Sequence, residues 1–333
     1  MKLTPFAKIL ILALVAVGIF FGVRKFLPQN TTTKTTTTEE TTSPARPVEE
    51  EEEKPSTTKS KNTTSRPAFS YLPPAPVNGT LKGVVELGAS GFNSFIINVD
   101  SKKTWKLEKA EFGSSLVYEN MATDDDVRAG LKNYISNMLS FGVAGKDIHF
   151  VVSSGAIKTP ETQKIAKGLK TLGYFVNPVT AEQEGAYALK CVLPASYAGE
   201  AFVLDIGSGN TKVSWLEGSE IKSGETYGSK YYQNNVSDQA AYDEATSIAA
   251  QIPASKRKVC FIIGGIPFEF AKAIRNGKER YTVLTKPEDI KAEGGKQKSG
   301  LNIYKAFADE TGCKTFVFDW DANFTIGFLL DLK

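Results

Sequence analysis

The sequence predicts an α/β fold built from two similar halves, with a ligand site between them. From Gly83 onward, short β-rich runs broken by glycine alternate with segments of helical periodicity. Each half opens with a strand, a Gly/Ser turn and a returning strand, and then passes to helix and strand. The two turns are Gly88-Ala89-Ser90-Gly91 and Gly207-Ser208-Gly209, so the pattern indicates a duplicated unit.

The elements of the first half follow from apolar spacing and from helix signals. Thr123 and Asp126 form a capping box, in which a hydroxyl and a carboxylate satisfy the first free amides of a helix. Apolar residues then recur at helical spacing up to Gly142. The expected strands are 84–87, 95–99, 105–107, 116–118, Ile148–Val152 and 174–176, and the expected helices are 127–141, 160–172 and Ala181–Val192.

The second half repeats this order in outline. Strands 202–205 and 211–216 flank its Gly/Ser turn, as in the opening hairpin of the first half. Helix 239–251 and strand Val259–Ile263 follow, and the glycine pair Gly264-Gly265 ends that strand. We therefore expect a first lobe at 79–197, a second lobe at 198–333, and a ligand cleft between them.

The residues before the lobes differ sharply in composition. Residues 9–23 are an unbroken apolar run, and with 6–8 included the run would span roughly 27 Å as a helix, close to the thickness of a bilayer core. This run predicts one transmembrane anchor at 6–25, with a cleavable signal peptide as the alternative. Basic residues lie on both sides of it, so its orientation stays open.

Residues 26–78 are rich in Thr, Glu and Pro and have no hydrophobic period, which predicts a disordered linker. Together with the anchor at 6–25, this predicts a single-pass protein of the cell membrane. The Thr-rich linker favours a domain outside the cytoplasm, although the orientation of the anchor stays open. The 40 basic and 37 acidic residues are interspersed, which argues against a nucleic-acid partner. Three distant cysteines, Cys191, Cys260 and Cys313, do not form a zinc or redox motif.

The two Gly/Ser turns suggest phosphate binding. Glycine allows close approach and a positive φ, so both turns can direct backbone N–H groups at one oxyanion from opposite sides. Glu86 and Asp205 come just before the turns, where each could hold a divalent cation or order its waters. Either turn alone could be an ordinary hairpin, but the later pair Gly264-Gly265 strengthens the phosphate hypothesis. No G-x-x-x-x-G-K-[ST] sequence is present, so a P-loop is not the means.

The same segments carry a family resemblance. ELGASGF (86–92), DIGSGNT (205–211) and IIGGIP (262–267) resemble the glycine loops of the superfamily of acetate kinase, sugar kinases, heat-shock chaperones and actin. More narrowly, the chain resembles the exopolyphosphatase/guanosine pentaphosphate phosphatase (Ppx/GppA) family over 83–330. The family's motif order is kept by VVSSGAIK, VTAEQEGA and FDWDANFTIGFLL. The resemblance implies two ribonuclease-H-like (actin-like ATPase) lobes with a cleft between them.

The resemblance also implies roles for particular residues. Glu184 matches the glutamate that serves the family as catalytic base, and Asp205 matches a catalytic, magnesium-side carboxylate. Glu86 replaces the first-loop aspartate, so Mg²⁺ would lie between Glu86 and Asp205. The implied phosphate-binding residues are Gly88, Ala89, Ser90, Lys158, Gly207, Ser208, Gly209, Asn210, Lys212, Gly264 and Gly265.

Other positions depart from the family. Lys212 stands where the second loop ends in an acidic catalytic residue, and Ala186 stands in place of an arginine. Thr325-Ile326 replace an Arg-Glu pair. Reversing a charge beside a metal site inverts its electrostatics, so a lysine there supports anion binding more readily than metal-assisted hydrolysis.

Three functions follow as hypotheses. The first is a Mg²⁺-dependent hydrolase that acts on polyphosphate or a guanosine polyphosphate. The second is a sensory or binding module that keeps the fold and the anion cleft without turnover. The third is an actin-like scaffold that binds a protein partner or a second copy of the chain. The departures from the family motif leave the choice between them to the structure.

Overall fold

The computed structural model describes residues 69–88, 91–112 and 124–332, all within one compact unit, Lys61–Lys333. Its two sheets with flanking helices confirm the predicted α/β class. The expected anchor at 6–25, the expected strand at 116–118, and Ala89 and Ser90 lie outside these residues. Within the described ranges, no helix has both the length and the apolar content needed to cross a bilayer.

The first sheet contains five strands in the order β3-β2-β1-β4-β5. The chain enters it through the predicted hairpin, which is antiparallel and closes with Gly88 paired to Gly91. The two later strands run parallel to β1. The strands are β1 (Thr80–Gly88), β2 (Gly91–Val99), β3 (Trp105–Phe112), β4 (Ile148–Val152) and β5 (Phe175–Pro178).

The second sheet contains six strands in the order β10-β11-β9-β6-β7-β8. It repeats the first at its centre, because an antiparallel hairpin, β6 and β7, is followed by a strand parallel to β6. The strands are β6 (Ala201–Ile206), β7 (Asn210–Glu217), β8 (Glu220–Tyr227), β9 (Val259–Ile263), β10 (Tyr281–Val283) and β11 (Phe316–Asp319).

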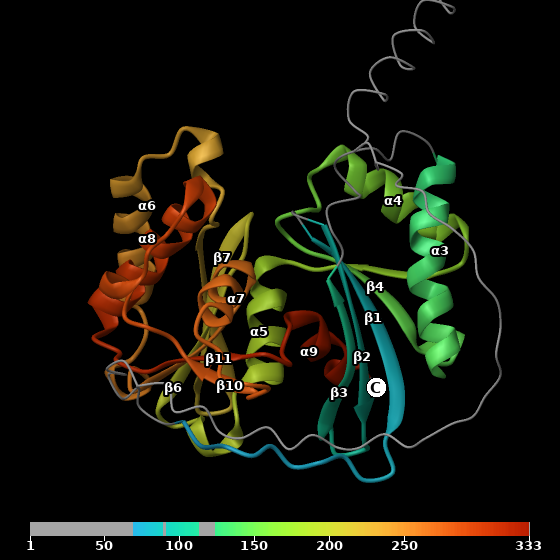
Figure 1. Ribbon diagram of the computed structural model, residues 1–333, viewed down its shortest axis with the longest axis horizontal. Coiled ribbons are helices and arrows are strands. Elements are labelled where there is room, and N and C mark those ends of the chain that lie inside the picture. The colour runs from blue at the N-terminus through green and yellow to red at the C-terminus, as the bar shows by residue number, and fades with distance from the viewer. Residues whose placement is uncertain (1–68, 89–90, 113–123, 333) are drawn as a thin grey trace, which may run out of the picture. The chain divides into compact units, whose positions relative to one another are not determined.

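Helices cover the outer face of each sheet, and two more lie between the sheets (Figure 1). The outer helices are α3 (Asp124–Phe141) and α4 (Pro160–Thr171) on the first sheet, and α6 (Asp238–Ala249), α7 (Gly265–Lys272) and α8 (Gly294–Thr311) on the second. The inner helices are α5 (Ala181–Val192) and α9 (Phe324–Asp331).

The inner helices are exchanged between the sheets. Helix α5 precedes the second sheet in sequence and packs on β7 and β8, whereas α9 follows the second sheet and packs on β1. The two helices also cross closely, since a Cβ added to Gly327 would lie 1.9 Å from the carbonyl oxygen of Tyr187. One apolar cluster therefore runs from Val84 of β1 through both helices to Phe261 of β9, and the sheets share a core.

A short segment that we call the N-terminal strap, residues 69–79, precedes β1. The ring centroid of Phe69 lies 5.6 Å from that of Phe261, and the ring centroid of Tyr71 lies 5.9 Å from that of Tyr281. Farther along, the amide of Val77 donates to Asp100 Oδ2 at 3.1 Å. The described structure thus extends upstream of the expected lobe boundary at 79, and the strap runs from the second sheet to the first (Figure 1).

Candidate functional site

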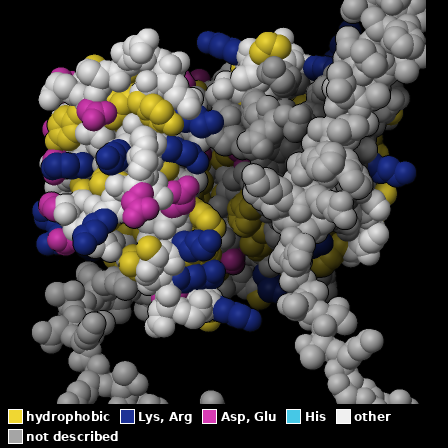
Figure 2. Space-filling model, turned by 45° about the horizontal axis from the view of Figure 1, so that its top comes forward, with side chains coloured by type: hydrophobic (Ala, Val, Ile, Leu, Met, Phe, Trp, Pro, Cys, Tyr) yellow, Lys and Arg dark blue, Asp and Glu magenta, His cyan; other side chains and the backbone are white. Residues whose placement is uncertain are grey.

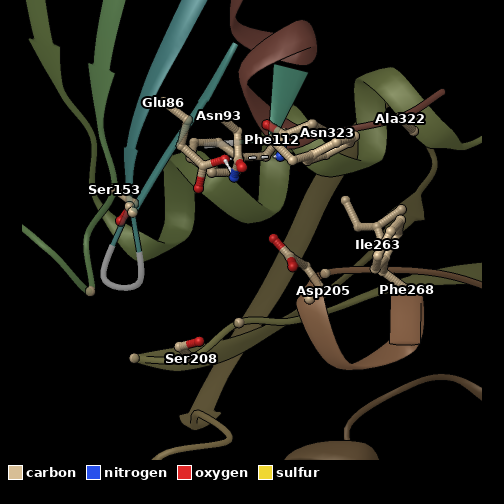
Figure 3. A pocket seen from close by; sticks show the side chains of 18 of the residues that line it. Glu86, Asn93, Phe112, Ser153, Asp205, Ser208, Ile263, Phe268, Ala322 and Asn323 are labelled. Carbon is tan, nitrogen blue, oxygen red and sulfur yellow. Dashed lines mark hydrogen bonds between the residues drawn. The ribbon is translucent and has the colours of Figure 1, made fainter. Parts of the chain in front are cut away.

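A cleft of about 430 Å³ opens between the two sheets. This volume falls within the range of roughly 300–1,000 Å³ that small-molecule sites occupy. Five turns contribute to its walls: the β1–β2 hairpin, the loop after β4, the β6–β7 hairpin, the β9–α7 junction and the loop before α9. Figure 3 shows Glu86 and Asp205 pointing into this space from opposite sides.

The structure brings together most of the residues that the sequence singled out. The residues in the cleft wall are Glu86, Gly88, Asp205, Gly207, Ser208, Gly209, Asn210, Lys212, Gly264 and Gly265. Lys158 is exposed in the turn after β4 and is not part of the wall. Glu184 is fully buried and also lies outside the wall. Ala89 and Ser90 fall outside the described residues.

Glycine is required where the turns meet. Gly264 has a φ of 107°, and a Cβ on it would lie 2.4 Å from the Ile206 carbonyl oxygen and 2.9 Å from Asp205 Oδ1. Only glycine tolerates this conformation and approach. The β6–β7 turn likewise touches the loop after β4, because a Cβ on Gly209 would lie 3.0 Å from the Cα of Gly155. The two lobes thus meet, backbone against backbone, beside the cleft.

Glu86 is held by two amides. Asn93, its cross-strand partner on β2, donates to Oε2 at 3.0 Å, and Asn323 donates to the same oxygen at 3.1 Å (Figure 3). The pKa of Glu86 is raised to about 7, because burial and the nearby Asp205 raise it by more than the hydrogen bonds from the two amides lower it. The carboxyl can therefore take up or release a proton near neutral pH.

Glu184 is engaged on both oxygens. Its Oε2 forms an ion pair with Lys212 Nζ, and its Oε1 accepts a hydrogen bond from the amide of Ser154. The side chains of Glu184 and Lys212 are 0% and 6% exposed. Burial by itself would lower the pKa of Lys212, but the carboxylates of Glu184 and Asp205 outweigh it and raise the pKa, so the lysine stays charged.

The residues present do not fit the magnesium site that the resemblance implied. Among the described residues, no group of three or more His, Cys, Asp or Glu side chains is placed to hold a metal ion. Mg²⁺ is commonly bound by one or two carboxylates together with waters and phosphate oxygens, so the charge beside Glu86 and Asp205 decides the fit. Here the ammonium of Lys212 forms an ion pair with Glu184 and is attracted by the charges of Asp205 and Glu86, and it would repel a second cation.

Several residues of the site were not predicted. Asn93 could have been predicted from the register of the β1–β2 hairpin, because it pairs directly with Glu86. Asn323, 237 residues away from Glu86, gave no such signal. It caps α9, with Oδ1 accepting from the Thr325 amide at 2.8 Å, and this cap fixes its side chain beside the first sheet.

One wall of the cleft is aromatic. Phe112 at the end of β3 is 60% exposed, and its ring centroid lies 5.7 Å from that of Phe268 on α7. The ring of Trp320 lies 5.4 Å from Phe268. Lys296 also faces the cleft, 4.0 Å from Glu269 Oε1. The cleft thus combines glycine turns and cations with a flat apolar wall.

The surface around the second lobe carries mixed charge. On the face shown in Figure 2, Lys and Arg side chains are interspersed with Asp and Glu side chains. Ion pairs of this lobe include Lys305 with Asp309 on α8 and Lys258 with Glu200. The two lysines that face the cleft, Lys212 and Lys296, also have a carboxylate beside them, Glu184 and Glu269 respectively.

Comparison with known proteins rests on structure. No family model and no curated protein matches the sequence. A Ppx/GppA family member from Aquifex aeolicus superposes with a TM-score of 0.56 at 15% identity, over 75% of this chain and 96% of its own. An exopolyphosphatase from Cytophaga hutchinsonii gives a TM-score of 0.56 at 12% identity, over 76% and 99% of the two chains. This chain thus has the two-lobed, actin-like fold of the Ppx/GppA proteins, which confirms the resemblance at the level of the fold.

Proposed function

We propose that the cleft binds a phosphorylated anion, a phosphate chain or a nucleotide, and that it does so without efficient hydrolysis. The observation that carries this proposal is the state of Glu184, which is fully buried, ion-paired to Lys212 and hydrogen-bonded to the Ser154 amide. A general base must reach the water that it activates, directly or through one water. A carboxylate outside the cleft wall with both oxygens engaged does not meet that requirement.

Anion binding is supported by the groups that do line the cleft. The turns at Gly207-Ser208-Gly209 and Gly264-Gly265 lie in its wall, and α7 begins at Gly265. Backbone amides at turns and helix N-termini attract negative charge. Lys212 and Lys296 add two side-chain cations. The class of ligand is suggested by the names of the fold relatives, which include an exopolyphosphatase.

A second candidate function is hydrolysis that uses Glu86 as general base. One observation favours it: Glu86 lines the cleft and its pKa lies at about 7. A base with a pKa near the working pH is suited to taking a proton from water. In this function Glu86 would replace Glu184 as the catalytic carboxylate, which places the base on β1 and not on α5.

Binding and release assays separate the two functions. We expect calorimetry to show tripolyphosphate or a guanosine polyphosphate binding to the full chain, and we expect no phosphate release above a blank. The matched control is Lys222→Ala, an exposed lysine on β8, which should leave binding unchanged. Release that Glu86→Gln abolishes and Glu184→Gln preserves would establish the second candidate. Release that Glu184→Gln abolishes would restore the family mechanism, and absence of any binding would overturn the proposal.

We further propose that residues 6–25 anchor this cleft to a membrane, on the strength of the apolar run at 9–23. The full chain should stay with membranes after alkaline carbonate extraction, and a chain without residues 1–25 should be released. Protease treatment of intact cells then reports the side on which the lobes lie, for which the Thr-rich linker favours the exterior. Release of the full chain by carbonate would contradict the anchor.

A further inference from the structure

We propose that Lys212 supplies, from within the chain, the positive charge that a divalent cation would otherwise supply to this cleft, so that the ligand binds without metal. The inference deepens the proposed function, on which its ligand-binding experiment rests. It starts from the disagreement between the magnesium site implied by the resemblance and the residues present. In this inference the ammonium of Lys212 neutralises negative charge of the ligand and of the cleft carboxylates.

The first observation is the convergence of carboxylates on one ammonium. Glu86 comes from β1 of the first sheet, Asp205 from β6 of the second, and Glu184 from α5 between the sheets. All three interact electrostatically with Lys212, and Asp205 is its direct cross-strand partner. Glu184 contacts the ammonium as an ion pair, and the charges of Asp205 and Glu86 attract it from the two sheets.

The second observation is how firmly the lysine is positioned. Gly185 lets α5 approach β7, since a Cβ there would lie 3.8 Å from the Cβ of Lys212 and 3.3 Å from that of Ser223. This approach places Glu184 of the same helix against the ammonium. At the other end, Nζ lies 3.6 Å from the Cβ position of Gly207. The charge is therefore fixed beside the β6–β7 turn, whose residues Gly207, Ser208 and Gly209 line the cleft.

The third observation is that the lysine is still available to a ligand. Lys212 belongs to the cleft wall although its side chain is 6% exposed. An ammonium has three donors, and Glu184 is its ion-pair partner among the described residues. The remaining donors can reach an oxyanion that sits on the turn. A metal ion at the same place would meet this ammonium at close range, and like charges there repel.

The experiment compares the full chain with Lys212→Met, which keeps the length of the side chain and removes the charge. Lys222→Met on the neighbouring strand is the matched control, because Lys222 is exposed. Tripolyphosphate affinity is measured by calorimetry in EDTA and in Mg²⁺, with the free ligand concentration corrected for its Mg²⁺ complex. Thermal melting with Mg²⁺ alone, without tripolyphosphate, gives a second readout.

We expect the tripolyphosphate affinity of the wild type to change less than twofold between EDTA and Mg²⁺. The melting temperature of the wild type should not change when Mg²⁺ is added. Lys212→Met should bind at least tenfold more weakly in EDTA, recover in Mg²⁺, and melt at a higher temperature when Mg²⁺ is added. Lys222→Met should behave as wild type. A tenfold loss of wild-type affinity in EDTA, or unchanged affinity of Lys212→Met in EDTA, would overturn the inference.

The melting experiment keeps the two proposals distinguishable. If the wild type binds no phosphorylated ligand, the proposed function fails, while Mg²⁺-dependent melting of Lys212→Met with a Mg²⁺-indifferent wild type still supports the inference. One Mg²⁺ bound per wild-type chain would overturn the inference whatever the ligand result. If Lys212→Met does not fold, Lys212→Arg is used in its place. This variant retains a cation, so its ligand binding should be insensitive to EDTA. Ligand binding by Lys212→Arg that is lost in EDTA would count against the inference.

Discussion

The carboxyl of Glu86 ties stability to pH. Its pKa of about 7, against an ordinary value of 4.5, means that the folded chain binds a proton here more tightly than the unfolded chain does. Stability should therefore fall as pH rises from about 4.5 to 7, by up to about 3 kcal/mol at this group. Glu86→Gln keeps an acceptor for Asn93 and Asn323 and removes the charge. It should be more stable than wild type at pH 8 and lose that advantage at pH 4.5.

Urea unfolding at the two pH values checks this prediction, because the difference between wild type and variant cancels the other titrating groups. Glu182→Gln is the control, since Glu182 is exposed on the first turn of α5. An equal offset between wild type and Glu86→Gln at both pH values would show that Glu86 titrates alike in the folded and unfolded chains.

The pair of Glu184 and Lys212 makes a second prediction at this scale. Removing one member leaves a buried charge without its partner, which typically costs about 3–5 kcal/mol. Glu184→Met alone should therefore destabilise strongly, and Glu184→Met with Lys212→Met should recover part of the loss, with a coupling energy of about 2–3 kcal/mol. Denaturant unfolding of the four chains measures the cycle. The exposed pair Lys190–Asp331, 37% and 46% exposed, should give at most about 1 kcal/mol, and equal coupling in both pairs would refute the prediction.

Residues of the site were predictable where their chemistry is contiguous in sequence. Asp205, Gly207 and Lys212 stand within eight positions of one another, so the turn and its charges could be seen together. The ion pair of Glu184 could not be predicted in this way. Its partner Lys212 lies on another element, and the pairing depends on how α5 packs on β7. The sequence placed a candidate base correctly on a helix start, and only packing shows that the cleft does not reach it.

At the scale of elements, agreement is best where an apolar run is bounded by clear breaks. Strands Ile148–Val152 and Val259–Ile263 and helix Ala181–Val192 have the predicted bounds. Strand β8 and helix α8 were not predicted. The sequence of β8, EIKSGETY, is largely polar because much of it is not buried, and α8 begins GGKQKSG, with three glycines, which disfavour helix. Tertiary packing outweighs local preference in both.

The crossing of α5 and α9 yields a prediction about glycine. A Cβ on Gly327 would lie 1.9 Å from the carbonyl oxygen of Tyr187, so alanine there must force the helices apart. We expect Gly327→Ala to cost more than about 3 kcal/mol, the range of severe overpacking. Gly168→Ala is the control, because nothing lies within 4 Å of its added Cβ and alanine favours helix by about 1 kcal/mol. Thermal unfolding should move in opposite directions for the two variants, and similar shifts would contradict the crossing.

For the whole molecule, the exchange of inner helices explains why the two lobes form one unit. The second sheet packs on α5, which ends the first half of the sequence, and the first sheet packs on α9, which ends the second half. Neither half therefore contains its entire core. Sequence order gave the duplication and the glycine turns, which are local. The exchange of α5 and α9 between the sheets could not be predicted from the sequence, because apolar periodicity shows which face of a helix is buried and not which sheet covers that face.

The N-terminal strap carries the last prediction, since it contacts both lobes. Phe69 and Tyr71 pack on Phe261 and Tyr281 of the second sheet, and the strap then leads into β1 of the first. Truncating both rings in the full chain should lower the free energy of unfolding by about 2–4 kcal/mol, below the full sum for buried aromatics because both rings are only partly buried. Amide exchange should rise in β10 and β1 together, because the strap joins their sheets.

Leu72→Ala is the matched control within the same strap, because the side chain of Leu72 is 91% exposed and has little packing to lose. Its unfolding and exchange should equal those of wild type. If Phe69→Ala with Tyr71→Ala raises exchange in β10 alone, the strap packs on the second sheet without coupling it to the first. Faster exchange in both strands instead means that the strap couples the two sheets.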